Sequence, residues 1–199
     1  GIGARRYCRS MRLIADIRTV VLCSLLAWMI VGCDQDVLYA TSFTEVATER
    51  TMLIDGIESY QSTDDAKRRF QQWAVIEESS LAPGDKRPPF SIYVVAIDSY
   101  SHLGYSGKLH LTFFNNRLAE ARFYPSNFEK YVERLQEHDK LTVTLTDKSA
   151  GSPEARVAPH TRIWIYNQPP LDQQGHNRYI GWGDVRLEKE ETLWIKRYS

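Results

Sequence analysis

The sequence has few cysteines, and none of them lies after residue 33. The three are Cys8, Cys23 and Cys33 in a chain of 199 residues. Residues 34–199 therefore form no internal disulfide and offer no thiolate for redox catalysis or for binding a metal. A fold made from these residues must depend on its apolar core, and the chain is long enough to bury a sizeable one.

The sequence also lacks an apolar run long enough to cross a membrane as a helix. Its longest uncharged, mostly apolar stretch covers residues 19–32. At 1.5 Å per residue this stretch reaches about 21 Å, whereas the hydrocarbon core of a bilayer is about 30 Å thick. Five arginines and one aspartate precede the stretch, and Asp34 follows it closely. A short apolar run with a basic flank is typical of a secretory signal peptide, with the basic flank kept in the cytoplasm.

The apolar stretch ends at Ile30-Val31-Gly32-Cys33, which resembles the lipobox of bacterial lipoproteins. The resemblance implies that Cys33 receives a diacylglycerol, that the bond before it is cut, and that its new amine is acylated, for example with palmitate. Two or three acyl chains anchor a protein stably to a membrane. An ordinary signal peptide, or a buried apolar helix with a chance cysteine, is the alternative interpretation.

We expect three parts in the chain: a signal peptide over residues 1–32 with Met11 as a candidate start, a lipidated tether over 33–47, and a single globular domain over 48–199. The resemblance to enteric lipoproteins implies that Asp34 acts as a sorting residue. It favours retention on the periplasmic face of the inner membrane over delivery to the outer membrane. The alternative is that Asp34 only opens a polar tether.

The charge balance bears on the partners of the protein. The whole chain has 25 basic and 25 acidic residues. Removal of the five arginines and one aspartate before residue 33 leaves 20 basic and 24 acidic residues, a net charge of −4. Because nucleic-acid binding requires a basic surface, we expect no nucleic-acid partner.

Apolar periodicity predicts an α+β fold, with two main helices packed on a mostly antiparallel sheet. Capping boxes at Ser62 with Asp65 and at Ser126 with Glu129 open the two helices. The predicted helices cover 63–73 and 126–138, and the predicted strands cover 51–54, 90–97, 108–114, 117–124, 141–146, 161–166, 178–187 and 192–198.

Residues 108–124 give the clearest hairpin, and its loop has two interpretations. A two-residue loop at Asn115-Asn116 is typical of hairpins. A loop of three residues, or of another odd number, instead pairs Phe113 with Ala119, Leu111 with Ala121 and Leu109 with Phe123. One face is then wholly apolar. We favour the odd loop because a slip of one residue moves every side chain to the other face of the sheet.

Residues 56–124 also resemble the β-lactamase-inhibitor-like modules of bacterial envelope lipoproteins, including the outer-membrane assembly accessory family. The resemblance lies in the order of a helix, a long loop, a strand and the hairpin around Gly107–Leu118. It implies a helix-plus-sheet domain that binds other proteins and catalyses no reaction.

No catalytic motif stands out in the sequence. It contains no His-Glu-x-x-His, no Gly-x-Ser-x-Gly and no phosphate-binding glycine loop, and Gly104–Gly107 is predicted to be a turn. We therefore assign no catalytic residue, no metal and no cofactor. A hydrolase would have to assemble its site from dispersed residues, namely Asp98, His102, His110 and Asp184.

Aromatic side chains offer a candidate binding surface near the C-terminal end. Its members are Trp164, Tyr166, Trp182 and Trp194. Exposed aromatic rings would stack on sugars or bind a protein partner, and the alternative is that they fill the core. Our leading hypothesis is a non-catalytic, lipid-anchored protein of the cell envelope that binds another envelope protein. The alternatives are a peptidoglycan or carbohydrate binder and an uncharacterised hydrolase.

Overall fold

A computed structural model describes residues 43–139, 154–167 and 178–199, all within one compact unit, Ser42–Ser199. Cys33, Asp34 and the predicted signal peptide lie outside the described residues, as does the predicted strand 141–146. None of the described helices is long and apolar enough to span a membrane.

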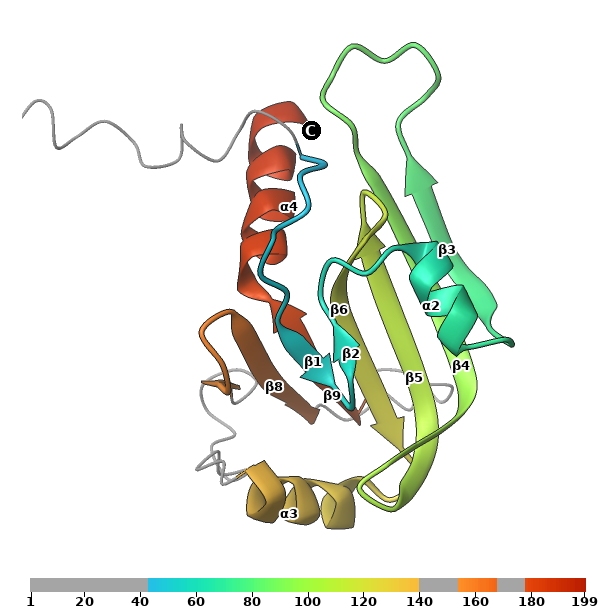
Figure 1. Cartoon of the computed structure of the whole chain (residues 1–199), viewed down its shortest axis with the longest axis vertical. Helices are drawn as coiled ribbons and strands as arrows, with labels where there is room; N and C mark the ends of the chain where they lie inside the picture. The colour runs from blue at the N-terminus through green and yellow to red at the C-terminus, as the bar shows by residue number, and fades with distance from the viewer. Residues whose placement is uncertain (1–42, 140–153, 168–177) are drawn as a thin grey trace, which may run out of the picture. The chain divides into compact units, whose positions relative to one another are not determined.

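Seven antiparallel strands form the main sheet in the order β3-β4-β5-β6-β9-β8-β7 (Figure 1). The predicted α+β class with a mostly antiparallel sheet is therefore confirmed. The strands of this sheet are β3 (Ala74–Ser80), β4 (Ser91–His102), β5 (Tyr105–Phe114), β6 (Arg117–Pro125), β7 (Glu154–Arg156), β8 (Thr161–Asn167) and β9 (Arg178–Asp184). A separate two-stranded sheet consists of β1 (Met52–Ile54) and β2 (Ile57–Glu58).

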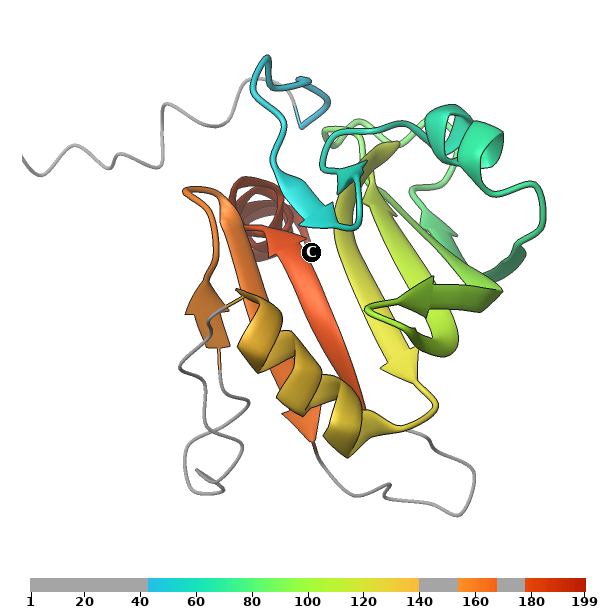
Figure 2. The ribbon, with the colours of Figure 1, turned by 60° about the horizontal axis from the view of Figure 1, so that its bottom comes forward.

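The two faces of the main sheet pack against different elements. Helices α2 (Thr63–Arg69) and α3 (Phe128–Asp139) lie on the same side as the β1–β2 pair, and helix α4 (Val185–Tyr198) lies on the other (Figure 2). The larger apolar cluster is on the α3 side and contains Leu111, Phe123 and Tyr131. A smaller cluster on the α4 side contains Phe43, Phe114 and Trp194.

The β5–β6 hairpin has the predicted register from Leu109 to Leu111, but the loop differs and the predicted pairing of Phe113 with Ala119 is wrong. Leu109 pairs with Phe123 and Leu111 with Ala121. The loop, however, has two residues, Asn115 and Asn116, with φ values of 48° and 58°, which is the backbone of a type I′ turn. A β-bulge makes the two-residue loop compatible with the apolar pairing, because Thr112 pairs with Glu120 and Phe113 with Leu118. The extra residue between them restores the apolar face that an even loop alone would lose.

Two helix boundaries differ from the predicted ones. The capping box at Ser62 is present, but α2 ends at Arg69 and Phe70 is already extended, with φ −117° and ψ 95°. The first turn of α3 is capped by Asn127, whose Oδ1 accepts from the backbone N–H of Lys130 at 3.3 Å, and not by the box predicted at Ser126. The predicted apolar stripe of α3 is confirmed, since Phe128, Tyr131, Val132 and Leu135 are all buried.

The C-terminal end of the chain is a helix, and the predicted strand 192–198 is wrong. Strand β9 ends at Asp184, whose carboxylate accepts from the backbone N–H of Arg186 and caps α4. Leu187 and Trp194 lie seven residues apart and are both buried, which is helical spacing. This stripe outweighs the β propensity of the short run that begins at Thr192.

The packed part of the chain begins before the predicted boundary at residue 48. The Phe43 side chain is only 1% exposed and lies in the cluster beneath α4. Its ring contacts that of Tyr198 edge to face at 6.1 Å between centroids. Residues 43–47 therefore belong to the folded domain and not to a free tether.

Candidate functional site

Strand β3 forms one edge of the main sheet, and the sequence patterns did not predict it. It pairs with β4 in antiparallel register from Ala74 opposite Ala96 to Ser80 opposite Ser91. None of the described residues pairs with its other side. All seven of its residues are exposed. Since it has neither a buried face nor alternating polarity, its sequence carries no strand signal of the usual kind.

The direction of the free hydrogen-bonding groups follows from one backbone contact. The N–H of Leu81 donates to the carbonyl of Phe90 at 3.3 Å, so Leu81 faces β4. Hydrogen-bonding residues alternate along an antiparallel pair. The backbone N–H and C=O groups of Glu78 and Ser80 therefore point away from β4, toward the outer edge.

Apolar side chains are exposed on this edge. Val75 is 48% exposed and Ile76 is 52% exposed. They lie at a β-bulge, because the register with β4 shifts between Val75 and Glu77. Bulges and charges are the usual protection of a sheet edge, but Glu77 to Ser80 remain in regular register. Four residues of regular edge are thus open to a further strand.

The first residue of helix α2 is fixed to the tip of the β5–β6 hairpin. The Oδ1 of Asn116 at the hairpin tip accepts from both the backbone N–H and the hydroxyl of Thr63, at 3.0 and 2.8 Å. Phe70 and Trp73 follow the helix and pack against the larger cluster. Helix α2 is thereby attached to the hairpin tip on the face of the sheet next to β3 and β4.

Three cavities lie along β3. The first, of 570 Å³, is beside Ala74 and is bordered by Phe70 and Trp73. The second, of 220 Å³, lies between α2 and the paired strands β3 and β4, and is bordered by Lys67 and Tyr93. The third, of 340 Å³, is at the end of the strand next to Ser80. Cavities on an edge strand are sites where side chains of an added strand would fit.

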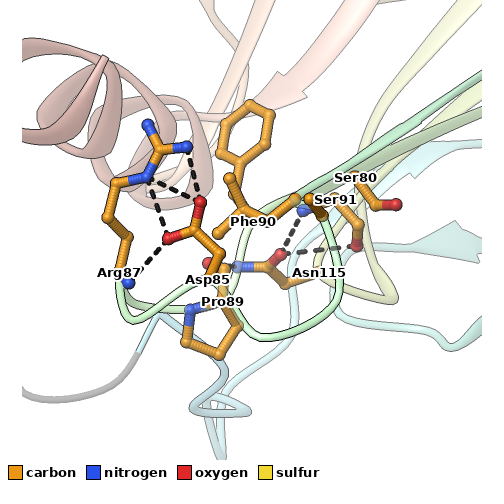
Figure 3. Close-up of a pocket in the computed structure, with 9 residues that line it drawn as sticks. Ser80, Asp85, Arg87, Pro89, Phe90, Ser91 and Asn115 are labelled. Carbon is orange, nitrogen blue, oxygen red and sulfur yellow. Dashed lines mark hydrogen bonds and ion pairs between the residues drawn. The ribbon is translucent and has the colours of Figure 1, made fainter.

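The third cavity is walled by a loop with strong internal contacts (Figure 3). Asn115 accepts from the backbone N–H of Ser91 at 2.6 Å and donates to the carbonyl of Pro89 at 2.8 Å. Side-chain and backbone hydrogen bonds from Arg87 lower the pKa of Asp85 to about 2. Arg87 also donates to the carbonyl of Tyr198 at 2.7 Å. The loop after β3 is thereby attached to the end of α4.

The acidic residues of β3 are without local partners. None of the described residues forms an ion pair with Glu77 or Glu78. On the α4 side, burial raises the pKa of Glu191, with further increases from the charges of Glu120, Glu188 and Glu77. Glu77 and Glu191 are therefore close enough to repel one another.

The four residues of the predicted aromatic surface do not form one surface. Trp182 and Trp194 are each 3% exposed, the first in the larger cluster and the second in the smaller one. Trp164 is 9% exposed and lies over Gly181, where an added Cβ would come within 2.2 Å of its ring. Tyr166 is half-buried on the same face of β8 as Trp164.

Tyr166 instead belongs to a row of rings across the sheet that the sequence analysis missed. Its ring stacks on that of Tyr179 at 5.0 Å, and Tyr179 contacts Tyr124 at 5.2 Å. His110 extends the row at 4.5 Å from Tyr124. Burial lowers the pKa of His110, as do the charges of Arg122 and Lys108, so this imidazole is neutral at pH 7. The sequence feature that could have predicted this row is the alternation of these rings with core residues along paired strands.

The dispersed residues considered for hydrolysis are not brought together. His102 contacts the Tyr131 hydroxyl at 2.7 Å, and His110 lies on the opposite face of the sheet in the tyrosine row. Asp184 is buried and caps α4. The exposed Asp98 pairs with Lys108 at 3.1 Å. Within the described ranges, no three His, Cys, Asp or Glu side chains are grouped to hold a metal ion.

Comparison with models of known protein families gave no match to this sequence. Comparison with curated proteins also gave none. We therefore infer function from the residues and their geometry.

Proposed function

We propose that this protein is a non-catalytic, lipid-anchored component of the bacterial cell envelope that binds an extended segment of another envelope protein by adding it to strand β3. The observation that carries the binding proposal is the free edge of β3. Its outward backbone groups, the exposed Val75 and Ile76 and the adjoining cavities are what strand addition requires. Backbone hydrogen bonds would supply affinity, and the cavities would select side chains.

A proline at the outer edge tests strand addition. Ser80→Pro removes an N–H that points away from β4, so it leaves the pairing with β4 intact. Ser80→Ala is the matched control, since it keeps that N–H. A photo-crosslinker at Ile76 should capture one partner in cells, and a crosslinker at the exposed Ile195 on α4 should not. We expect the Ile76 crosslink to be lost in Ser80→Pro and kept in Ser80→Ala; equal capture in both variants would contradict strand addition.

The anchor rests on the lipobox and its flanks. The apolar stretch, its basic N-terminal side and the residues Ile30-Val31-Gly32-Cys33 support acylation at Cys33 and a place on the outer face of the inner membrane. Cys33→Ala should abolish labelling with a radioactive or clickable palmitate and leave an uncleaved precursor. Unchanged labelling would end the lipoprotein proposal. Asp34→Ser should move the protein toward the outer-membrane fraction if Asp34 retains it.

The tyrosine row favours a second candidate function, carbohydrate binding. Tyr166 and Tyr179 stack face to face and Tyr124 is tilted against Tyr179, so this row would offer a sugar chain mainly ring edges and hydroxyl groups. The guanidinium of Arg122, 5.4 Å from the Tyr179 ring centroid, adds hydrogen-bond donors. Sedimentation with purified peptidoglycan tests this function: Tyr179→Ala should reduce it, and equal sedimentation of that variant would remove the candidate.

A further inference from the structure

The acids of β3 lie on both faces of the edge. Glu77 pairs with Val94, and Glu78 pairs with Tyr93. Tyr93 packs against the larger cluster, which places Glu78 on the α2 side. Because side chains alternate along a strand, Glu77 lies on the α4 side. Any strand added to β3 must therefore meet a carboxylate on each of its faces.

The same acids argue against a second copy of the chain as the occupant. An antiparallel β3–β3 pair related by a twofold axis near Glu77 or Glu78 would bring carboxylates of the two copies opposite one another. Like charges directly opposite on adjacent strands destabilise the pair. Glu77 and Glu78 thus protect the edge from self-association while leaving it open to a strand of the opposite charge.

The α4 side of the edge carries an excess of negative charge. Arg122 forms an ion pair with Glu120, and Arg162 forms one with Glu188. Neither Glu191 nor Glu77 forms an ion pair with any of the described residues, although the charge of Arg122 acts on Glu191. A lysine or arginine on this face of an added strand would lie beside Glu77 and in the field of Glu191.

The α2 side is nearly neutral and has room for side chains. Here Glu78 shares the border of the 220 Å³ cavity with Lys67, together with the uncharged Tyr93. The larger cavity farther along this side is bordered by Phe70 and Trp73. Apolar side chains on this face of an added strand would fill these cavities, and Lys67 on the same border would offset the charge of Glu78.

We infer that the segment added to β3 is a basic, amphipathic strand, with lysine or arginine directed toward Glu77 and Glu191 and apolar side chains directed toward α2. This inference rests on the proposed strand addition and specifies the chemistry of the partner. It identifies the unpaired acids as the residues that select the segment.

Two synthetic peptides test the inference on the full-length protein in detergent. One is a fluorescent six-residue peptide of alternating lysine and valine, and the other has glutamate in place of lysine. Fluorescence anisotropy should show the lysine peptide binding about tenfold more tightly or better. Glu77→Lys should remove this preference. Glu133→Lys, on the exposed side of α3, changes the net charge equally and should keep it.

The outcomes separate this inference from the proposed function. Equal binding of both peptides, abolished by Ser80→Pro, would overturn the charge preference and leave strand addition in place. Binding of the lysine peptide that Ser80→Pro does not affect would overturn both. Binding of neither peptide would show that the stated chemistry is wrong. A dimer in sedimentation velocity that Ser80→Pro dissociates would show that a second copy is the occupant.

Discussion

Arg117 joins three parts of the domain although it carries a charge and is only 2% exposed. Its guanidinium donates to the carbonyls of Phe43 and Glu45, at 2.6 and 2.8 Å. It also pairs with Glu190 on α4 at 2.9 Å. A buried cation is tolerated only when its donors are satisfied in this way. The start of the folded chain, the hairpin and α4 are thus connected through one side chain.

Truncation of Arg117 should be strongly destabilising. Arg117→Ala leaves the half-buried Glu190 carboxylate without its partner. It also leaves the carbonyls of Phe43 and Glu45 without the donors that Arg117 supplies. Loss of one member of a buried pair costs about 3 kcal/mol or more, and we expect a loss of this size in urea denaturation. Arg134→Ala is the control, because Arg134 forms only an exposed ion pair with Glu137. A loss below about 1 kcal/mol at Arg117 would show that its contacts add little.

Glu191 predicts a stabilising substitution that depends on pH. Burial raises its pKa, and the charges of Glu120 and Glu188 raise it further. The folded state therefore holds the Glu191 proton more tightly than the unfolded state does. This contribution to stability is present below the unfolded pKa and is lost as pH rises through the folded pKa.

Glu191→Gln should accordingly stabilise the protein at pH 7 by about 0.5 kcal/mol, since it removes a charge that burial and the neighbouring acids disfavour more than Arg122 favours it. The gain should shrink as the pH falls below the folded pKa of Glu191, where the native residue is also neutral. Thermal unfolding of both proteins at pH 7 and at pH 4.5 measures this difference. A gain that is equal at the two pH values would show that the charge of Glu191 is not its cause.

At the scale of the elements, the β5–β6 hairpin depends on its two asparagines. Both have positive φ, a conformation that asparagine adopts more readily than most residues. Asn116 also binds Thr63 at the start of α2 through its side chain. It therefore has separate backbone and side-chain roles, which two substitutions distinguish.

Asn116→Ala should lower stability by about 1–2 kcal/mol from the left-handed backbone alone, in addition to the cost of the lost bonds to Thr63. Asn116→Gly keeps the backbone conformation and loses only those bonds, so we expect it to be the milder change. Chemical denaturation of the two variants checks the order. If glycine is as harmful as alanine, the contact with α2 and not the turn controls this site.

The hairpin and its neighbours show what the sequence could predict. The register of β5 and β6 followed from their apolar faces, because only one pairing buries Leu109, Leu111 and Phe123 together. The bulge was not predictable from the sequence. It arises because a two-residue loop and a wholly apolar face require an extra residue in one strand. Strand β3 escaped prediction because neither of its faces is buried. The sequence did not predict helix α4 because the run after Glu191 has high β propensity. In the fold, Trp194 of this run packs on Phe90, which is distant in sequence, and this packing favours the helix.

At the scale of the whole molecule, the folded domain begins closer to the proposed lipid than the sequence indicated. Phe43 is buried, so the packed residues begin ten positions after Cys33 in the sequence. At no more than about 3.6 Å per residue, ten steps of chain from Cys33 reach about 36 Å, against about 54 Å for the fifteen steps to residue 48.

The earlier boundary predicts that Phe43 stabilises the domain as a core residue does. Phe43→Ala removes a ring that contacts Tyr198 and lies in the cluster with Phe114 and Trp194. Truncation of a buried phenylalanine costs about 3–5 kcal/mol, and we expect a loss in this range in urea denaturation. Val46→Ala, at a side chain that is 58% exposed, should change stability by less than about 0.5 kcal/mol. Equal small effects at both positions would mean that residues 43–47 are part of the tether. The maximum chain length from Cys33 to the domain would then be the longer of the two values above.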